Sequence, residues 1–371
     1  MKNILVILGT RPEAIKLAPV ILNLRKDPDV RVLVCNTEQQ KELSNQTLNF
    51  FGITADFKLD TMQPNQTLAG VQSRILSTVS DIYKNNKIDA TIVQGDTMTV
   101  FCGALVSFYN RVPVFHVEAG LRSYDLFEPF PEEAMRQMTA RITDLHFAPT
   151  QLAYEALLKE NIPPKKIIRT GNTVIDALSC LSEEIMKEAQ NKLLSRSVSL
   201  NDKLVLVTVH RRENHGDRLD RILEAITLLT KKYSDHQFVL PVHPNPNVYT
   251  KVHTALGNIQ NVILTEPLDY PELVCLMKST KLILTDSGGV QEEAPTFGNP
   301  VLVMRYETER TEGVDAGFSK LVGADIDKII SESDAILSKN KSETRLDGSK
   351  NPYGDGHATE KITTAIKEFW K

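Results

Sequence analysis

The sequence predicts an α/β protein with two Rossmann-like, doubly wound domains that face a cleft. Three observations lead to this fold class. The chain has 371 residues, which is long for one hydrophobic core and sufficient for two. Short apolar runs alternate with longer amphipathic segments, as expected of parallel strands joined by crossover helices. The alternation stops near Gly171 and Asn172 and then resumes, which indicates two domains.

The first series contains five apolar runs that are typical of buried strands. They lie at residues 4–8, 30–34, 90–93, 112–115 and 145–147. Residues 12–26 have a helical pattern of apolar positions, with Thr10 as a candidate cap and a proline in the first turn. We therefore expect an N-terminal domain at residues 1–170.

The second series repeats this organisation. Its expected strands lie at residues 204–207, 238–240, 262–264, 282–284 and 301–303, and its expected helices include 219–232 and 325–338. The polar stretches 311–317 and 342–355 are expected to be loops. We place this second domain at residues 171–357.

Composition limits the classes of partner. The net charge of −4 gives no electrostatic reason to expect nucleic acid or an anionic membrane. The four cysteines are far apart without C-x-x-C spacing, so neither disulfides nor zinc are expected. No apolar stretch reaches about 18 residues, and no signal-peptide pattern precedes the first strand-like run. We expect a cytoplasmic protein without a metal.

Ligands of open parallel sheets bind beyond the carboxyl ends of the strands, so the residues that follow each strand are the candidates for function. GTRPEAIK, residues 9–16, follows the first run. Its glycine permits a tight turn, the N–H groups of the helix start favour an anion, and Arg11 and Lys16 add two cations. The motif lacks the glycines of the known phosphate loops, and an ordinary helix start with two solvated basic residues is the alternative.

Three acidic residues follow strands of the first series. Asp96 lies in QGDT, Glu118 in HVEAGLR, and Glu132 at an expected helix start behind a proline. Carboxylates that share one rim suit proton transfer, because crowding and partial burial raise their pKa values. In the alternative interpretation Asp96 caps a helix and Glu132 favours a helix dipole.

The second series also ends its strands in polar motifs. HRREN, residues 210–214, puts His210 and two arginines at a strand end, which suits a diphosphate, although a solvated charge run is the alternative. His243 lies in a proline-stiffened loop and is expected to be structural.

The sharpest local signal is TDSGGVQEE, residues 285–293. A strand runs into Ser287, Gly288 and Gly289 and then into a helix, so backbone N–H groups there can hold a phosphate. Glu293 lies about one turn into that helix, where a carboxylate can bind a ribose diol. Arg305 and Arg310 follow the next strand and add positive charge.

In order along the chain, the motifs GTRPEAIK, QGDT, HVEAGLRS, PEEAMR, GNTVID, HRREN, TDSGGVQEEAP and NPYGDG closely resemble those of the non-hydrolysing UDP-N-acetylglucosamine 2-epimerases. The resemblance covers nearly the whole chain. It implies the glycosyltransferase-B-like architecture, activity without NAD or metal, a homodimer, and a final helix at about 358–370 that crosses back to the first domain. We accordingly assign residues 358–371 to that helix.

The resemblance also implies residue roles. Asp96, Glu118 and Glu132 match the catalytic acids, and His210 matches a residue that helps UDP leave. The positions that match substrate-binding residues are Arg11, Lys16, Leu268, Leu273, Ser287, Gly288, Gly289, Glu293 and Arg310.

Two segments depart from the family pattern. Many members have Gln-His-Arg where this chain has Gln39-Gln40-Lys41, a segment that in several members helps to hold a second, activating substrate molecule. Gln39 and Arg74 remain in matching places. After Met304 this chain continues RYETERTEG, and Tyr306 and its neighbours could reflect a modified substrate.

The resemblance implies reversible epimerisation at carbon 2 of UDP-N-acetylglucosamine, to UDP-N-acetylmannosamine, for surface polysaccharide precursors. In the family's route UDP is eliminated, 2-acetamidoglucal stays bound, and UDP adds back after reprotonation. The alternatives are a 2-epimerase for a modified UDP-acetamido sugar, a glycosyltransferase on the same architecture, a hydrolysing 2-epimerase and a non-catalytic sugar-nucleotide sensor.

Overall fold

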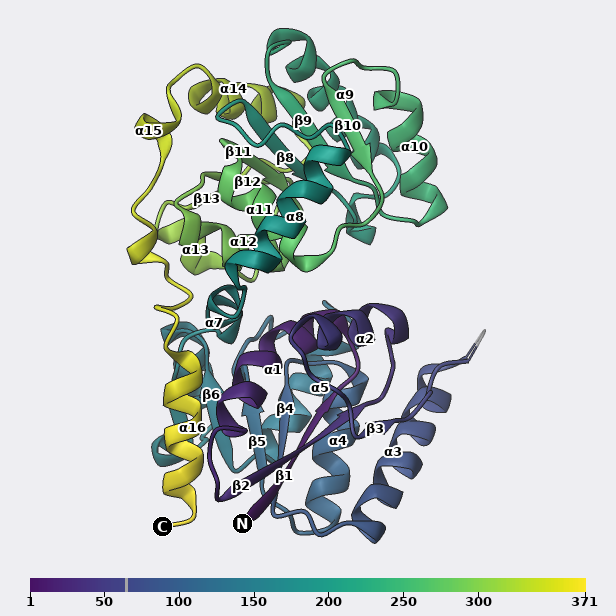
Figure 1. The fold of residues 1–371 in the computed structure, drawn as a ribbon, viewed down its shortest axis with the longest axis vertical. Coiled ribbons are helices and arrows are strands. Elements are labelled where there is room, and N and C mark those ends of the chain that lie inside the picture. Colours follow the sequence, from purple (N-terminus) through teal and green to yellow (C-terminus); the bar gives the residue numbers. More distant parts are fainter. Residues whose placement is uncertain (64–65) are drawn as a thin grey trace. The chain divides into compact units, whose positions relative to one another are not determined.

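The computed structural model describes residues 1–63 and 66–371, which form two compact units. The N-terminal unit comprises Met1–Cys180 and Tyr353–Lys371, and the C-terminal unit comprises Leu181–Pro352. Each unit is built around one parallel sheet with helices packed against it (Figure 1). The predicted class, α/β with two Rossmann-like domains, is therefore confirmed. No helix among the described residues is long and apolar enough to cross a membrane.

The sheet of the N-terminal unit has the strand order β3-β2-β1-β4-β5-β6-β7, and all its pairs are parallel. The order reverses between β1 and β4, which is the point where ligands of such sheets bind. The strands are β1 (Lys2–Leu8), β2 (Val30–Asn36), β3 (Phe57–Lys58), β4 (Ala90–Gln94), β5 (Val114–Val117), β6 (Leu145–Ala148) and β7 (Ile167–Arg169).

The helices of this unit cover a sheet whose central strands are almost wholly buried. Apolar residues of β1, β4 and the helices α3 and α4 share one core, as expected of strands with helices on their faces. The helices are α1 (Arg11–Leu24), α2 (Lys41–Phe50), α3 (Leu68–Asn85), α4 (Met98–Tyr109), α5 (Glu132–Arg141), α6 (Gln151–Lys159), α7 (Thr173–Ser179) and α16 (Ala358–Phe369).

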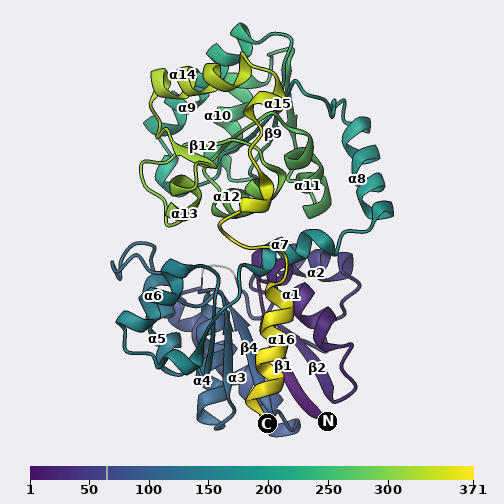
Figure 2. The same ribbon diagram turned by 90° about the vertical axis from the view of Figure 1, so that its left-hand side faces the viewer.

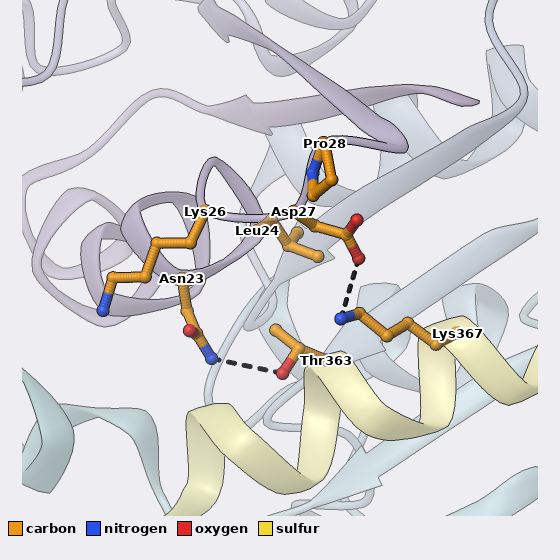
Figure 3. A pocket seen from close by; sticks show the side chains of 7 residues that line it. All are labelled: Asn23, Leu24, Lys26, Asp27, Pro28, Thr363 and Lys367. Atoms are coloured by element: carbon orange, nitrogen blue, oxygen red, sulfur yellow. Dashed lines mark hydrogen bonds and ion pairs between the residues drawn. The ribbon is translucent and has the colours of Figure 1, made fainter. Parts of the chain in front are cut away.

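The last helix, α16, belongs to the N-terminal unit although it ends the chain (Figure 2). It packs against α1, where Asn23 Nδ2 donates to Thr363 Oγ1 at 3.2 Å and Lys367 pairs with Asp27 at 2.8 Å (Figure 3). These residues border a small pocket of about 170 Å³. At the other end of the helix, Phe369 packs edge-on against Phe115, with ring centroids 5.1 Å apart.

The unit boundaries differ from the expected 170/171 and 357/358, because α7 and the start of α16 are joined by hydrogen bonds. The backbone N–H of Asn172 donates to the carbonyl of Tyr353 at 2.7 Å. The buried carboxylate of Asp176 accepts the N–H groups of Ala358 and Thr359 at the start of α16, at 3.3 and 2.8 Å. Both chain crossings therefore lie past α7 and before residue 353.

The C-terminal unit repeats the topology with the order β10-β9-β8-β11-β12-β13, again all parallel. Here the order reverses between β8 and β11. Its strands are β8 (Leu204–Thr208), β9 (Gln237–Pro241), β10 (Val262–Thr265), β11 (Leu282–Thr285), β12 (Val301–Val303) and β13 (Ser319–Leu321), and its helices are α8 (Glu183–Ser195), α9 (Asp217–Lys232), α10 (Pro246–Leu256), α11 (Tyr270–Ser279), α12 (Gly288–Glu293), α13 (Thr311–Asp315), α14 (Ile326–Leu337) and α15 (Lys341–Thr344).

Every strand and helix that the apolar patterns predicted is present, although the run at 112–115 forms a strand at Val114–Val117. The expectation of plain loops at 311–317 and 342–355 was wrong, because these stretches contain α13, most of α15 and a 3-10 turn at Gly348–Lys350. These helices have three to five residues, too few for an apolar period to show. In α15 the signal was a capping box between Asn340 and Glu343.

Candidate active site

Two of the predicted acids leave neighbouring strands at the same edge of the N-terminal sheet. Strand β4 pairs with β5 in a register that puts Gln94 opposite Val117, so Asp96 and Glu118 each follow shortly after a paired residue. Glu118 has a φ of 62°, a left-handed conformation that is uncommon outside glycine and that often marks functional sites.

The helix that begins at the third acid, Glu132, is tied to this edge by an arginine that the sequence analysis did not single out. Arg136, one turn further along α5, donates from Nε to Asp96 Oδ2 at 2.8 Å and lies 3.2 Å from the carboxylate of Glu133. Burial would raise the pKa of Glu133, but hydrogen bonds from Gln137, two backbone N–H groups and Arg136 lower it. Arg136 thus ties the start of α5 to the end of β4.

Lys16 is a buried partner of Glu118. The two side chains form an ion pair, and each is 8% exposed. Asn172 Nδ2 lies 3.4 Å from the same carboxylate oxygen, Oε2. A carboxylate held between an ammonium and an amide has a fixed position, which general acid–base catalysis requires.

The loop after β1 is closed by its own carboxylate, contrary to the expectation that its N–H groups would favour an external anion. Glu13 Oε2 accepts the N–H groups of Gly9 and Thr10, both at 2.7 Å, and Glu13 Oε1 accepts the hydroxyl of Thr97. Burial raises the pKa of Glu13 against the opposing effect of these hydrogen bonds. The next N–H group, that of Arg11, donates to Gln40 Oε1 at 3.1 Å.

In the C-terminal unit, His210 follows β8 and is held by Asp286, which follows the neighbouring strand β11. The ring Nδ1 lies 3.0 Å from Asp286 Oδ1. The backbone N–H groups of His210 and Arg211 and the amide of Asn214 also donate to this carboxylate, at 2.9 to 3.1 Å. Burial would raise the pKa of Asp286, but the His210 contacts and the backbone N–H groups hold it below its usual range.

The loop after β11 leads into a helix whose start is uncapped. Ser287 is the N-cap of α12, but its side chain makes no capping bond. Its N–H donates to Thr285 Oγ1, while Gly288 and Gly289 begin the helix, where N–H groups have no carbonyl one turn back. A Cβ at Gly288 would lie 2.8 Å from Arg310 Cζ, so the guanidinium rests directly against this loop.

Three arginines gather around this loop. Burial lowers the pKa of Arg211, and the charges of Arg305 and Arg310 lower it further. Arg310 is paired with Glu292 at 3.0 Å and with Glu309 at 3.2 Å. The buried Nε of Arg211 has no hydrogen-bond partner among the described residues. The side chain of Arg212, also named in the motif, lies outside what the structure describes.

The predicted ribose and uridine contacts gather at the start of α11. Glu293 is buried, and its Oε2 accepts the hydroxyl of Tyr270 at 2.9 Å. Leu268 is buried just before this helix, and Leu273 is half-buried on it. Tyr270 was not predicted, and its only sequence signal is its place at the first position of a helix capped by Asp269.

The predicted allosteric residues are engaged inside the N-terminal unit. Gln39 Oε1 accepts the hydroxyl of Thr99 at 3.0 Å. Arg74 donates from Nε to the carbonyl of Thr61 at 2.8 Å and also bonds the side chain of Gln66. Gln39 and Arg74 thus have different hydrogen-bond partners and come from different elements.

The residues that depart from the family pattern have internal partners too. Lys41 pairs with Glu38 at 3.4 Å and with Asp60 at 2.9 Å. In the C-terminal unit, the ring of Tyr306 packs against Gly323 and lies under the guanidinium of Arg218, 5.1 Å from the ring centroid. These contacts give Tyr306 a packing role within its own unit.

The structure thus collects the predicted residues into two groups. The N-terminal group is acidic and contains Asp96, Glu118 and Glu132 with Arg11 and Lys16, whereas the C-terminal group contains His210, Ser287, Gly288, Gly289, Glu293, Arg310, Leu268 and Leu273. Within the described ranges, no cluster of three or more His, Cys, Asp or Glu side chains could hold a metal ion.

Comparison with known proteins matches this arrangement to one family. The family model of UDP-N-acetylglucosamine 2-epimerase matches residues 22–367. The curated UDP-N-acetylglucosamine 2-epimerase of Neisseria meningitidis is 43% identical over 367 residues, covering 98% of this chain and 99% of the relative. That of Escherichia coli K12 is 44% identical over 371 residues, covering 98% of each chain.

Solved structures agree with the sequence relatives. The crystal structure of the Neisseria meningitidis UDP-GlcNAc 2-epimerase bound to UDP-GlcNAc superposes with a TM-score of 0.91 at 43% identity, covering 99% of this chain and 100% of that one. The UDP co-structure of S. aureus MnaA gives a TM-score of 0.88 at 39% identity, covering 100% and 97%. The chain therefore belongs to the UDP-N-acetylglucosamine 2-epimerase family.

Proposed function

We propose that this protein interconverts UDP-N-acetylglucosamine and UDP-N-acetylmannosamine by eliminating UDP and adding it back. The observation that carries the proposal is the loop after β11, where two glycines begin an uncapped helix beneath Arg310. Such a loop suits a diphosphate, because its backbone N–H groups and a guanidinium converge on one place. The acids of the N-terminal unit supply the other half of the chemistry.

The diphosphate group must be stabilised as it leaves. Breaking the bond between carbon 1 and the phosphate oxygen gives the electron pair to UDP, so negative charge grows on the β-phosphate. Cations and backbone dipoles that are already in place stabilise this charge more than water would. We assign this role to Ser287, Gly288, Gly289, His210 and Arg310, with Arg11 as a further cation.

The sugar needs proton transfer on both faces of carbon 2. Its hydrogen is weakly acidic in the intact sugar and becomes acidic when carbon 1 gains positive charge. One carboxylate then takes this proton as the double bond forms between carbons 1 and 2, and another acid returns a proton to the opposite face as UDP re-adds. Asp96, Glu118 and Glu132 are the groups we assign to these steps.

Incubation in heavy water tests the mechanism. Elimination and re-addition must introduce deuterium at carbon 2 of both substrate and product, which NMR detects. Retention of the original hydrogen through many turnovers contradicts the proposal. The same spectra separate the rival activities: a glycosyltransferase needs an acceptor, a hydrolysing enzyme releases UDP and free N-acetylmannosamine, and a modified-sugar epimerase leaves plain UDP-N-acetylglucosamine unchanged.

The family membership supports three broader proposals. We propose a homodimer that works in the cytoplasm and feeds precursors to surface polysaccharides. Light scattering on the purified protein would measure the mass in solution, for which a monomer of 41.5 kDa is the contrary result. We also retain the proposal that Gln39 and Arg74 contribute to activation by substrate, which a sigmoidal rate curve would support and a hyperbolic one would contradict.

A further inference from the structure

We propose that Asp286 is a positioning residue that acts through His210, fixing the ring so that its Nε2 donates a hydrogen bond to the departing diphosphate. This inference rests on the proposed function. The inference goes beyond the proposed function because it explains how His210 is oriented. It also identifies which of the neighbouring imidazole rings, His210 or His243, carries the positive charge.

The contacts of Asp286 leave one productive orientation for the ring. Asp286 is fully buried, and its carboxylate contacts His210 twice, through the backbone N–H at 3.0 Å and through ring Nδ1 at 3.0 Å. A histidine that engages a carboxylate through Nδ1 presents Nε2 as its other functional atom. The His210 side chain is 38% exposed, so the ring has a side that a ligand can reach.

The carboxylate is itself rigid. Besides His210, it accepts the N–H of Arg211 at 2.9 Å and the Nδ2 of Asn214 at 3.0 Å, and Asn214 also donates to the carbonyl of Met304. These donors hold the anion in place without solvent, and a buried anion stabilises an adjacent imidazolium more strongly than an exposed one. Orientation and charge of His210 are therefore set by the same group.

Other histidines lie near the His210 ring, so the positive charge must be assigned to one of several imidazoles. The ring of His243, from the loop after β9, stacks on that of His210 with centroids 6.2 Å apart. Burial lowers the pKa of His243, and the neighbouring His210 and His215 lower it further. Two stacked imidazoles repel each other when both are charged, and the ring that contacts Asp286 is the one that the geometry favours as the cation.

Other charged groups face this cluster and belong in any account of its pH dependence. Arg211 lies on the same loop as His210. The charges of four groups influence its pKa, namely Arg305, Arg310, Glu309 and Asp286. These arginines are cations throughout the accessible pH range, so they give a constant background.

The departure of UDP requires His210 to act only as a hydrogen-bond donor. As the bond between carbon 1 and the phosphate oxygen breaks, the electron pair moves to the oxygen of UDP, and the protonated ring donates a charge-assisted hydrogen bond to a diphosphate oxygen. The ring keeps its proton, so the step needs no other reactant. In the reverse direction the same hydrogen bond holds UDP for re-addition.

The test is the pH profile of kcat in Asp286→Asn, which keeps the size of the side chain and removes its charge. We expect kcat to fall about 10- to 100-fold, by analogy with the loss that follows when the partner that orients a metal-bound histidine is changed. In the profile of kcat against pH, the basic limb is the part where activity falls as the pH rises. This limb should move to lower pH in Asp286→Asn. Asn214→Ala is the matched control, because it removes a neutral contact to Asp286 and should leave the limb in place.

A double-mutant cycle separates positioning from general structural damage. If Asp286 acts through His210, Asp286→Asn in a His210→Gln background should cost less than about twofold in kcat, because the interaction is already lost. Losses that multiply across the two sites, or a limb that stays in place in Asp286→Asn, overturn the proposal. Should Asp286→Asn fail to fold, Asp286→Glu serves instead: it should keep the limb and lower kcat, and wild-type kcat overturns the inference.

Measurements of UDP binding distinguish a failure of the Asp286 assignment from a failure of the proposed function. Calorimetry measures UDP affinity without turnover, and we expect it to weaken with rising pH in the wild type and to lose most of that dependence in Asp286→Asn. A wild type that shows this behaviour but incorporates no deuterium contradicts the proposed reaction and leaves the Asp286 assignment standing. Deuterium incorporation with identical pH dependence in both proteins contradicts the assignment alone.

Discussion

The two units share their strand order but close the ends of their central strands differently. In the N-terminal unit, Glu13 fills the loop after β1 and Thr97 caps the helix after β4. In the C-terminal unit, Asp286 fills the loop after β8, whereas Ser287 leaves the helix after β11 uncapped. Three of these four switch-point loops are thus satisfied internally, and the helix that follows the fourth has no side-chain cap.

This difference teaches that topology alone does not make an anion site. The N-terminal switch point has a glycine turn and a helix start, the features that usually hold phosphate, but a carboxylate from the same helix already occupies them. Its free edge carries Asp96 and Glu118 instead. The same topology therefore carries a loop closed by a carboxylate in the N-terminal unit and a glycine-rich helix start beside an arginine in the C-terminal unit.

The largest effect should come from Glu118→Gln, which tests the acidic half of the comparison. We expect kcat to fall about 10²- to 10⁴-fold, the usual contribution of a positioned acid or base, while UDP affinity changes little. Rate measurements with calorimetry check both quantities. Equal losses in kcat and UDP affinity would instead mean that Glu118 binds substrate.

The ion pair with Lys16 supplies the control for that variant. Removing the Glu118 carboxylate takes a buried countercharge from Lys16, so stability also falls. The double variant Glu118→Gln with Lys16→Met should recover stability in a urea titration without recovering kcat. Recovery of both would show that the activity loss came from unfolding.

The next effect concerns the closed loop after β1. Glu13→Ala leaves the N–H groups of Gly9 and Thr10 without their acceptor, and we expect the free energy of unfolding to fall by about 2–4 kcal/mol. Inorganic phosphate should then raise the melting temperature of Glu13→Ala more than that of wild type, because an external anion can replace the lost carboxylate. Glu42→Ala, at an exposed helix start, should show neither effect.

A smaller effect is expected at the open loop. Arg310→Gln removes the guanidinium that rests on Gly288, and UDP should bind about 10- to 100-fold more weakly, which corresponds to one lost hydrogen-bonded charge. Calorimetry at fixed ionic strength measures this loss. Arg345→Gln, an exposed arginine of the same unit, is the control. The same loss of UDP affinity in both variants would mean that Arg310 acts only through the net charge of the protein.

The sequence predicted the sheets well because buried parallel strands leave continuous apolar runs. It missed β3, β7 and β13, which are edge strands of two or three residues, too short for a pattern. The carboxylate that closes the first loop had a local signal, since Thr10 and Glu13 have the spacing of a capping box.

Other functional contacts had no local signal. Arg136 and Asp96 are forty residues apart in the chain, and Asp286 and His210 are seventy-six apart. Each pair meets because its members follow or flank adjacent strands, so only the strand order of the folded sheet brings them together. The candidate residues could be predicted from the motifs, but their ion-pair and hydrogen-bond partners required the three-dimensional fold.

A last effect concerns acid stability, and it should distinguish the units. His116 and His146 are buried neighbours on β5 and β6, and burial lowers their pKa values to about 4 and about 3. In the unfolded chain both take up protons near the ordinary value of 6.5. Their neutral forms therefore favour folding fully above pH 6.5, and this advantage is lost as the pH falls from 6.5 toward 4.

We expect the N-terminal unit to lose about 1.4 kcal/mol per pH unit for each histidine across this window. Urea titrations at pH 7, 6 and 5, followed by hydrogen exchange to resolve the two units, measure the slope. His146→Leu is the sharpest variant, because the ring is fully buried and burial is the main cause of its low pKa. It should halve the slope at little cost at pH 7, and an unchanged slope would assign the acid sensitivity to other groups.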